Sequence, residues 1–342
     1  MLRNAVGIPV LQGGEDVKSE FQLIDEIAQR IKPRADVLLG IGDDCAIVSP
    51  PKGKRLALST DTLVAGVHFF ADTEPYLIGY KALAVNLSDL AAMGAKPLWY
   101  SMALTLPNAD AHFARELTRG MHTLSVEHDI ALIGGDTTRG PLAITITVIG
   151  ALDAGVGSAS VALQRSGAQI GDGVYVSGTL GDAAGALKLR TGGQAEPVWL
   201  AQRLDQPTPR IALGLALHGI ASSAIDVSDG LIADLTHICR QSGCSATLYA
   251  ERLPLSHELV MAHGLPFAWQ CALGGGDDYE LLFTAAPKHE AALAKLAGAQ
   301  ALAISRIGTI GASHAHPERV SVLDAGGLLV AISRRGYEHF SK

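Results

Sequence analysis

Residues 225–243 read IDVSDGLIADLTHICRQSG, which predicts a strand, a tight turn and a helix in direct succession. The stretch opens with β-branched residues, Gly230 marks the turn, and apolar residues then recur at helical spacing. Residues 174–190, VYVSGTLGDAAGALKLR, repeat this order, and residues 274–286, GGGDDYELLFTAA, place a glycine turn before a strand. We therefore expect an α/β fold in the second half of the chain.

The first half of the chain alternates strand and helix patterns in the same way. Alternating or β-branched segments predict strands, and apolar residues at helical spacing predict helices. The predicted strands are 55–64, 97–107 and 142–150, and the predicted helices are 19–32, 77–95 and 112–129. The region 151–173 is rich in Gly, Ala and Ser, so we expect it to open a second domain. The expected domains are 1–150 and 151–342.

Composition excludes several classes of protein. The chain has 342 residues, 48% of them hydrophobic and 18% charged, which is typical of a globular protein. The net charge of -7 argues against broad binding to nucleic acid. No apolar stretch approaches the roughly 18 residues that span a bilayer, and the N-terminus lacks the pattern of a signal peptide. The four cysteines form no CxxC pair, which favours a cytoplasmic protein with reduced thiols.

Aspartates recur where strands or glycine turns are expected to meet helices. Each one alone is typical of a turn or a helix cap. A fold that gathers several of them needs cations to balance their charge. Oxygen-only donors favour Mg²⁺ first, with Mn²⁺ or Ca²⁺ behind it. The recurring residues are Asp43, Asp44, Asp61, Asp89, Asp136, Asp226, Asp229, Asp277 and Asp278.

Phosphate is the expected companion of such a magnesium site. Magnesium held by few carboxylates keeps waters and completes its coordination with substrate phosphates. The glycine pairs Gly134–Gly135 and Gly178 with Gly181 would let backbone N–H groups approach phosphate oxygens, particularly where a helix begins. Neither a Walker A sequence nor GxGxxG is present, so a P-loop or Rossmann site is not expected. Basic residues near the motifs are few, so a polyphosphate would depend on metal ions for charge balance.

The sequence offers no nucleophile for covalent catalysis. It contains no Ser/His/Asp order and no Cys/His pairing that predicts one.

The motifs together resemble the thiamine-monophosphate kinase family. The matching blocks are GIGDDCAIV (40–48), LSTDTLVAGVHF (58–69), YKALAVNLSDLAAMGAKP (80–97), LIGGDTTRGP (132–141), AIDVSDGLIADL (224–235) and GGGDDYELLFT (274–284). The resemblance implies kinship with aminoimidazole ribonucleotide synthetase and a two-domain α/β (α+β) fold. It also implies that N-terminal domains form a β-barrel across a homodimer, and that ATP lies between this barrel and a C-terminal α/β domain. The implied reaction is Mg²⁺-dependent transfer of the ATP γ-phosphate to thiamine monophosphate, giving thiamine diphosphate and ADP. Because this acceptor is itself an ionised phosphate, no general base is obligatory, and catalysis reduces to alignment and charge neutralisation. We therefore expect direct in-line transfer without a phosphoenzyme. The alternatives are another ATP-dependent synthetase of this superfamily and a non-catalytic nucleotide-binding sensor.

The resemblance also assigns roles to single residues. Positions matching magnesium ligands are Asp44, Ser59, Thr60, Asp61, Asp89, Asp136, Asp226 and Asp229. Positions matching ATP contacts are Gly135, Asp136, Arg165 and Ser228, and those matching contacts to the thiamine phosphate are His68, Asp277 and Tyr337. The family commonly has Glu where this chain has Asp277, so the shorter acid would reach the substrate directly or through water. No function is assigned to residues 1–13.

Overall fold

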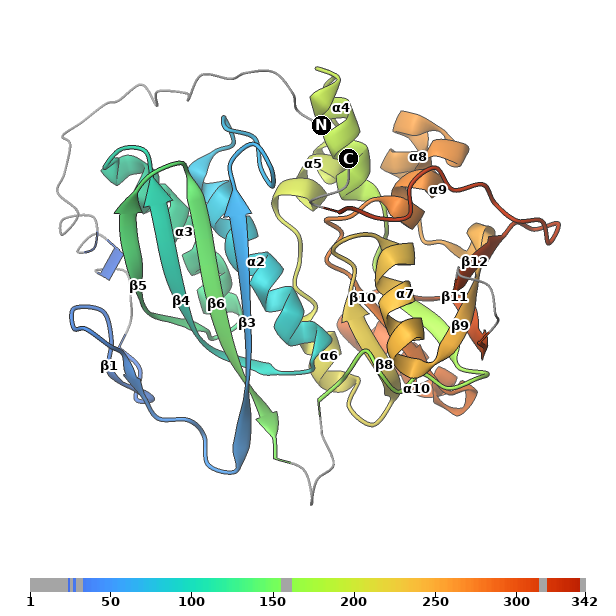
Figure 1. Ribbon diagram of the computed structural model, residues 1–342, viewed down its shortest axis with the longest axis horizontal. Helices are drawn as coiled ribbons and strands as arrows, with labels where there is room; N and C mark the ends of the chain where they lie inside the picture. Colours follow the sequence, from blue (N-terminus) through green and yellow to red (C-terminus); the bar gives the residue numbers. More distant parts are fainter. Residues whose placement is uncertain (1–23, 25–26, 29–32, 155–161, 314–318, 339–342) are drawn as a thin grey trace. The chain divides into compact units, whose positions relative to one another are not determined.

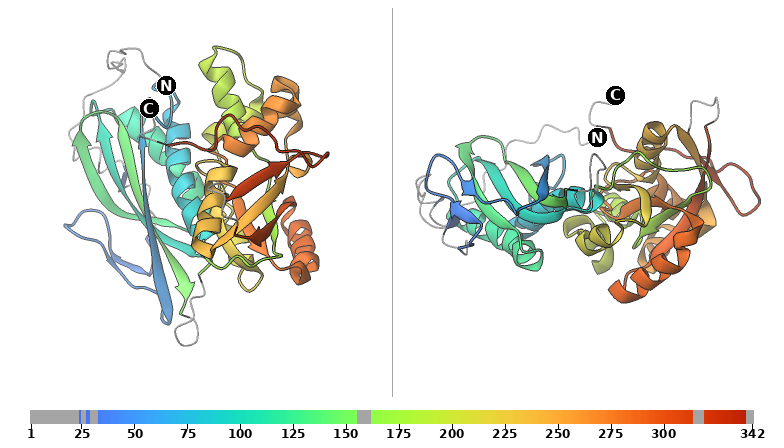
Figure 2. Two further views of the ribbon diagram at one scale, coloured as in Figure 1. Left: turned by 45° about the vertical axis from the view of Figure 1, so that its right-hand side comes forward. Right: turned by 90° about the horizontal axis from the view of Figure 1, so that it is seen from below.

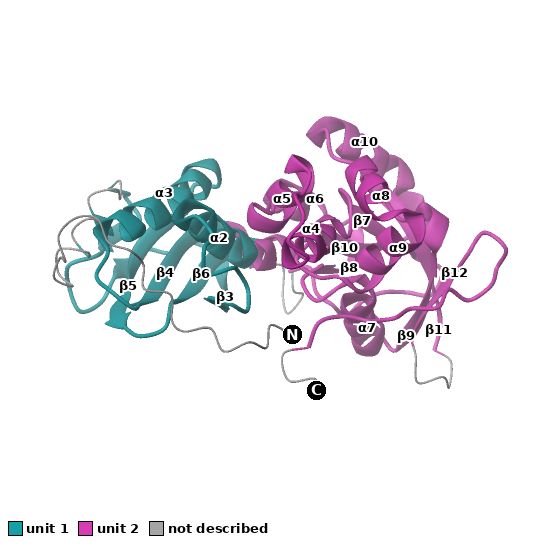
Figure 3. Cartoon of the chain, turned by 90° about the horizontal axis from the view of Figure 1, so that it is seen from above, with its two compact units in different colours: residues 1–87, 97–151 teal, residues 88–96, 152–342 magenta. Residues whose placement is uncertain are grey.

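The computed structural model describes residues 24, 27–28, 33–154, 162–313 and 319–338 (Figure 1). Contacts divide the chain into two compact units (Figure 3). Unit 1 comprises residues 1–87 and 97–151, and unit 2 comprises residues 88–96 and 152–342. The predicted helix at 19–32 falls almost entirely outside the described residues. Among the helices that are described, none combines the length and the apolar character that a membrane crossing requires.

Unit 1 contains a four-stranded sheet in the order β3-β6-β4-β5 and a separate hairpin of β1 and β2. The sheet strands are β3 (Lys54–Val64), β6 (Ala143–Asp153), β4 (Lys96–Leu106) and β5 (Ala131–Arg139), and the hairpin strands are β1 (Val37–Leu39) and β2 (Ile47–Val48). Hydroxyl pairs at 2.8 Å join Thr60 to Thr147 and Thr62 to Thr145. Because the numbering rises on one strand as it falls on the other, β3 and β6 run antiparallel.

Helices α2 (Pro75–Ala92) and α3 (Ala111–Glu127) cover one face of this sheet (Figures 2 and 3). The Asp110 carboxylate caps α3 by accepting the Phe113 N–H at 3.0 Å. Phe113, Leu117 and Leu124 are buried along one side of α3, at the spacing of an amphipathic helix. Burial of this apolar stripe against α2 and the sheet fixes the helix in place.

The two helices approach each other closely at a pair of glycines. A Cβ atom on Gly79 would overlap the backbone carbonyl of Leu117, and one on Gly120 would overlap that of Tyr76. Only glycine therefore permits this separation of α2 and α3.

The opposite face of the sheet in unit 1 is covered only in part. Val37 and Val48 of the hairpin pack against the cluster that contains Trp99. Along β3, Leu56 and Leu58 are 41% and 64% exposed. Strands β3 and β5 are the two edges of an open sheet, so the described part of one chain forms no closed barrel.

Unit 2 is built on a six-stranded sheet in the order β12-β9-β11-β7-β10-β8. Its strands are β7 (Gly173–Ser177), β8 (Ala221–Asp226), β9 (Cys244–Tyr249), β10 (Leu281–Ala285), β11 (Ile304–Ala312) and β12 (Val320–Leu323). Neighbouring strands are antiparallel except β12 and β9, which are parallel. The helices are α4 (Asp182–Thr191), α5 (Val198–Asp205), α6 (Ile211–Ala216), α7 (Leu231–Ser242), α8 (His257–His263), α9 (Leu265–Gly274) and α10 (Glu290–Gln300), with 3-10 turns η1 (Ala250–Arg252) and η2 (Pro287–His289).

Alternation along β7 shows how this sheet is sandwiched. Val174 and Val176 are fully buried in the core cluster that also contains Leu235 of α7. Tyr175, between them, stacks on Phe283 with the ring centroids 5.5 Å apart, and its hydroxyl lies 3.5 Å from Glu290 of α10. Helices α7 and α10 accordingly lie on opposite faces of the sheet (Figure 3).

Most of the predicted elements are confirmed. The three predicted strands of the first half are β3, β4 and β6, and the predicted helices at 77–95 and 112–129 are α2 and α3, with small shifts at their ends. The predicted strand–turn–helix segments at 174–190 and 225–243 are β7 with α4 and β8 with α7. One expectation is corrected: Gly134, Gly135 and Asp136 lie inside strand β5 rather than at the start of a helix.

Candidate active site

The loop between β8 and α7 is the centre of the site in unit 2. Asp226 ends β8, is 4% exposed, and accepts a 2.8 Å hydrogen bond from the Ser88 hydroxyl. Ser88 belongs to the final turns of α2 that pack within unit 2. The predicted ligand Asp89 follows it directly, so α2 brings Asp89 to the same end of β8.

Asp234 holds this loop from below, and the sequence motifs did not single it out. Its carboxylate accepts hydrogen bonds of 3.1, 3.2 and 3.1 Å from the backbone N–H groups of Ser228, Asp229 and Gly230. Burial, together with the neighbouring charges of Asp226 and Asp229, raises the pKa of Asp234 to about 8. The sequence signal for this role is the position of Asp234 among the apolar residues of GLIADL (230–235). A carboxylate buried at such a position needs hydrogen-bond donors around it.

Two further segments meet the same loop. The N–H of Asp277 donates to the Ser228 carbonyl at 2.9 Å, and the N–H of Tyr337 donates to the Asp229 carbonyl at 2.8 Å. Unit 2 therefore brings the predicted magnesium ligands Asp226 and Asp229 together with residues predicted to contact ATP and thiamine phosphate.

Basic groups lie at the border of this loop. The guanidinium of Arg334 is 5.3 Å from the centroid of the Tyr337 ring. Arg165, the predicted ATP contact, is exposed, and its carbonyl accepts a 3.3 Å hydrogen bond from Ser242 at the end of α7. The pKa of His237 on α7 is lowered, mainly because the imidazole is partly buried and also because of the positive charge of Arg165.

In unit 1, strand β3 carries three of the predicted magnesium ligands in a row. The N–H of Asp61 donates to the Asn86 side chain at 3.1 Å, and Asn86 is itself anchored to the Ala82 carbonyl at 2.9 Å. α2 thus fixes the backbone of β3 at Asp61. Ser59 and Asp61 alternate with Thr60, so the two sets point to opposite faces of the sheet.

His68 lies in the turn that follows β3. Its Nδ1 accepts the Val64 N–H at 3.0 Å, which leaves Nε2 to carry the proton of the neutral ring. Lys81 is buried, and its ammonium donates to the His68 carbonyl in this turn at 3.4 Å.

Asp136 is separated from Asp61 within unit 1. Asp136 lies on edge strand β5 opposite Ala103 of β4, whereas Asp61 lies on edge strand β3. Three interstrand steps of about 4.8 Å separate their two strands by roughly 14 Å across the sheet. Gly135 permits close pairing of the strands, because a Cβ atom there would overlap the Met102 carbonyl.

Asp43 and Asp44 play different parts in their exposed turn. The Asp43 carboxylate accepts the N–H of Asp44 at 2.8 Å, so Asp43 shapes the turn. The Asp44 side chain is exposed and stays the predicted ligand.

The donors gathered at the β8–α7 loop fit a hard divalent cation. Within the described chain, no three His, Cys, Asp or Glu side chains converge closely enough to form a metal site by themselves. Mg²⁺ commonly takes one or two carboxylates and completes its coordination with water and phosphate oxygens. The carboxylates of Asp226 and Asp229 meet that requirement, and the charge they concentrate around Asp234 favours a cation there.

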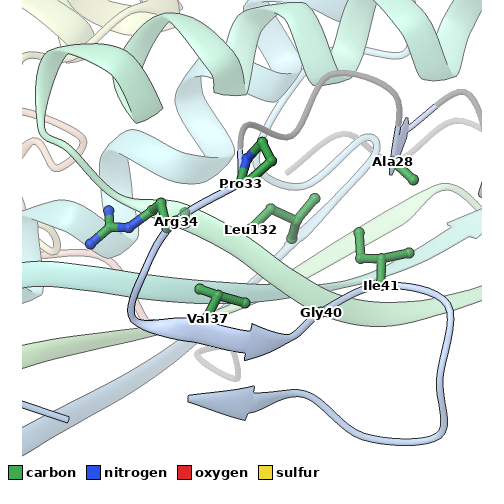
Figure 4. Close-up of a pocket in the computed structure, with 8 residues that line it drawn as sticks. Ala28, Pro33, Arg34, Val37, Gly40, Ile41 and Leu132 are labelled. Carbon is green, nitrogen blue, oxygen red and sulfur yellow. The ribbon is translucent and has the colours of Figure 1, made fainter. Parts of the chain in front are cut away.

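Unit 1 also contains a pocket beside β1 (Figure 4). It has a volume of about 240 Å³, and β1 forms one of its walls. Its lining residues are Ala28, Pro33, Arg34, Val37, Gly40, Ile41, Ala131 and Leu132. None of them is a predicted site residue, so the pocket is not the candidate active site.

Both halves of the chain match known protein families. Residues 42–152 match the N-terminal domain of AIR synthase related proteins, and residues 169–319 match the C-terminal domain of the same proteins. The thiamine-monophosphate kinase of Salmonella typhimurium is 45% identical over 335 residues, covering 94% of this chain and 98% of that protein.

Solved structures agree with this result. The crystal structure of thiamine-monophosphate kinase from Stenotrophomonas maltophilia is 48% identical and superposes with a TM-score of 0.82, covering 89% of this chain and 96% of that one. A structure described as AaThiL complexed with AMPPCP and TMP is 32% identical, with a TM-score of 0.73, and covers 94% of this chain and 97% of that one. The chain belongs to the AIR synthase related family and, within that family, to the thiamine-monophosphate kinases.

Proposed function

We propose that this chain transfers the γ-phosphate of ATP to thiamine monophosphate, giving thiamine diphosphate and ADP. The observation that carries the proposal is the convergence of three segments in unit 2. The loop of Asp226 and Asp229 is hydrogen-bonded to the backbones of Asp277 and Tyr337. Residues expected to hold metal and nucleotide are thereby joined to residues expected to hold the acceptor. The thiamine-monophosphate kinase of Salmonella typhimurium is 45% identical to the chain, and the relative described with AMPPCP and TMP is 32% identical.

The chain's own residues would act by binding and orientation. Asp226 and Asp229 in unit 2, and Asp44, Asp61 and Asp136 in unit 1, would hold magnesium ions. Bound Mg²⁺ neutralises phosphate charge and so allows two anionic groups to approach each other. The backbone bonds from the β8–α7 loop to Asp277 and Tyr337 would hold the acceptor segments in register with the nucleotide segment. Because the attacking phosphate oxygen is already ionised, no residue of the chain has to remove a proton.

The remaining site residues complete the proposed assignment. We propose Ser59, Thr60 and Asp89 as further magnesium ligands, Gly135, Arg165 and Ser228 as ATP contacts, and His68 as a contact to the thiamine phosphate. His68 is held in the turn after β3 by the Val64 N–H, which Nδ1 of its ring accepts at 3.0 Å.

A coupled assay of ADP release tests the proposed reaction. ADP and thiamine diphosphate should appear in equal amounts when the protein receives ATP, thiamine monophosphate and Mg²⁺, and neither should appear when Mg²⁺ is chelated. Release of ADP with formylglycinamidine ribonucleotide in place of thiamine monophosphate would contradict the proposal, as would ATP binding without turnover. A stable phosphorylated protein after incubation with ATP alone would contradict direct transfer.

We further propose that the protein works as a homodimer whose N-terminal domains complete a barrel. The support is the incompletely covered face of the sheet in unit 1, where the apolar side chains of Leu56 and Leu58 are exposed on edge strand β3. Exposed apolar residues on an open sheet favour association with another surface. The resemblance to the family implies that this other surface belongs to a second copy of the chain.

A further inference from the structure

The segment that carries Asp277 has an unusual backbone. Asp277 has φ of 69° and Tyr279 has φ of 50°, both in the left-handed region that favours glycine. Asp tolerates this region moderately well, but a bulky residue such as Tyr is a genuine outlier there. Such a conformation persists only where surrounding contacts impose it, and it is concentrated at functional sites.

Backbone hydrogen bonds hold this segment against the β8–α7 loop. The N–H of Asp277 donates to Ser228, the N–H of Tyr279 donates to Val227, and the N–H of Val227 donates back to Glu280, each at 2.9 Å. The Tyr279 hydroxyl then donates to the Asp277 carboxylate at 3.0 Å. The two strained residues therefore determine how the Asp277 side chain is presented.

Beneath the segment lies a buried cluster of charges. Asp278 and Glu280 are fully buried, and Asp278 accepts the Gly181 N–H at 3.0 and 2.9 Å. Glu280 accepts from Arg203 at 2.8 Å and from Arg210 at 2.7 and 2.5 Å. Burial raises the pKa of Asp278 well above its usual range, and the positive charge of Arg203 opposes that rise.

Arg203 connects the two halves of this cluster. Its Nη2 donates both to the Glu280 carboxylate at 2.8 Å and to the backbone carbonyl of Asp278 at 3.0 Å. The hydrogen bond to the Asp278 carbonyl holds the residue that lies between the two left-handed residues, Asp277 and Tyr279. Buried ion pairs contribute little net stability compared with an apolar core, whereas they can specify one conformation. A conformation-specifying role thus explains the cluster better than stability does.

We propose that Arg203 is a positioning residue for thiamine monophosphate: it fixes the left-handed conformation of Asp277–Tyr279 and so presents the Asp277 carboxylate to the acceptor. The inference rests on the proposed function, because it takes thiamine monophosphate as the ligand of this segment. It also accounts for how the shorter Asp277 serves where the family commonly has Glu, since a rigid backbone determines the reach of a short side chain.

Steady-state kinetics of Arg203→Met and Arg203→Lys test the proposal. Without the bond to the Asp278 carbonyl, the KM for thiamine monophosphate should rise about 10-fold or more, while the KM for ATP changes less than about 2-fold. Lys keeps a cation beside Glu280 but lacks the fork that bonds two acceptors at once, so its effect should be intermediate. Calorimetric titration with thiamine monophosphate should show the same loss of affinity.

Arg190→Met is the matched control. Arg190 of α4 forms ion pairs at 2.6 Å with Asp205, the last residue of α5, and with Glu196, which precedes α5. It should lower the thermal midpoint without changing the KM for thiamine monophosphate. If Arg203→Met does not fold, Arg203→Lys and Glu280→Gln take its place, with a smaller rise expected that is again selective for the KM of thiamine monophosphate.

Two outcomes would overturn the inference. In the first, the folded Arg203 variants keep the wild-type KM and affinity for thiamine monophosphate. In the second, the KM values for both substrates rise equally, as they would for a purely structural residue. Either result with an active wild-type protein refutes the positioning role alone, whereas a wild-type protein that does not phosphorylate thiamine monophosphate refutes the proposed function as well.

Discussion

Asp226 is a buried acidic residue of the candidate metal site. The residue is 4% exposed, and its carboxylate accepts a hydrogen bond from the Ser88 hydroxyl. Substitution by Asn keeps the volume and an acceptor for Ser88 but removes the charge that a divalent cation requires. We expect Asp226→Asn to fold, with the free energy of unfolding within about 1 kcal/mol of wild type, and to lose turnover by about 100-fold or more.

Titration with Mg²⁺ at saturating ATP and thiamine monophosphate checks this prediction. Asp44→Asn should behave similarly, whereas Asp43→Asn, next to it, should retain most activity because Asp43 serves the turn. Wild-type turnover by Asp226→Asn at limiting Mg²⁺ would remove this residue from the metal site.

The sequence predicted the residues that would bind metal or substrate, because they recur in recognisable motifs. It was less informative about residues that only hold those motifs in place. Asp226, Asp229 and Asp277 lie in glycine turns, and their recurrence in the sequence indicated a site. Asp234 supports those residues from a position that is typical of a helix. Asp278 is one of the recurring aspartates, but its supporting role inside the turn was not predicted. Their role depends on which backbone N–H groups fold back onto them, and sequence spacing does not reveal that.

At the scale of elements, the contact between α2 and α3 is constrained by glycine on both helices. A methyl group on Gly120 would overlap the Tyr76 carbonyl, and backbone atoms cannot move aside as a flexible side chain can. We expect Gly120→Ala to lower the free energy of unfolding by about 1–3 kcal/mol, measured by urea denaturation. Val126→Ala, at an exposed position of the same helix, should change it by less than about 0.5 kcal/mol. Equal stability of the two variants would show that the helices separate without cost.

The end of α3 gives a prediction about pH. Burial lowers the pKa of His128, and Nε2 of its ring has no hydrogen-bond partner in the described part of the chain; Glu127, 3.8 Å away, opposes the shift. The unfolded chain therefore binds a proton at this group that the folded chain does not, once the pH falls below roughly 6.5. By linkage, His128 lowers stability as the pH falls through that value.

His128→Gln removes this titration and serves as the comparison. The free energy of unfolding of the variant relative to wild type should increase between about pH 7.5 and about pH 5.5. A difference that stays constant over this range would mean that His128 has the same pKa in both states.

Elements were predicted well wherever periodicity was strong, and β5 shows why it fails elsewhere. The sequence LIGGDTTRG contains two glycines and several polar residues, which are typical of a turn. Parallel pairing with β4 overrides that preference, because Gly135 lets the two backbones approach closely. Pairing partners distant in the sequence decide such a strand.

At the scale of the whole molecule, helix α2 belongs partly to unit 1 and partly to unit 2. Residues 75–87 of α2 pack within unit 1, whereas 88–92 pack within unit 2. The composition of the sequence predicts a single domain boundary near residue 150. Contacts, however, place residues 88–96, which precede that boundary, in unit 2. Ser88 and Asp89 thereby accompany Asp226, so the first half of the sequence contributes to the site in the second unit.

The proposed dimer gives the last prediction, at the same scale. Leu58 is 64% exposed on edge strand β3, and a carboxylate there would be desolvated if a second copy covered the open sheet. We expect Leu58→Asp to shift a wild-type dimer toward monomer by at least about 10-fold in dissociation constant, measured by sedimentation equilibrium. Leu328→Asp, at a leucine that is 69% exposed in unit 2, should leave the association unchanged. A monomeric wild-type protein would contradict the dimer, and a Leu58→Asp variant as tightly associated as wild type would place the interface on another surface.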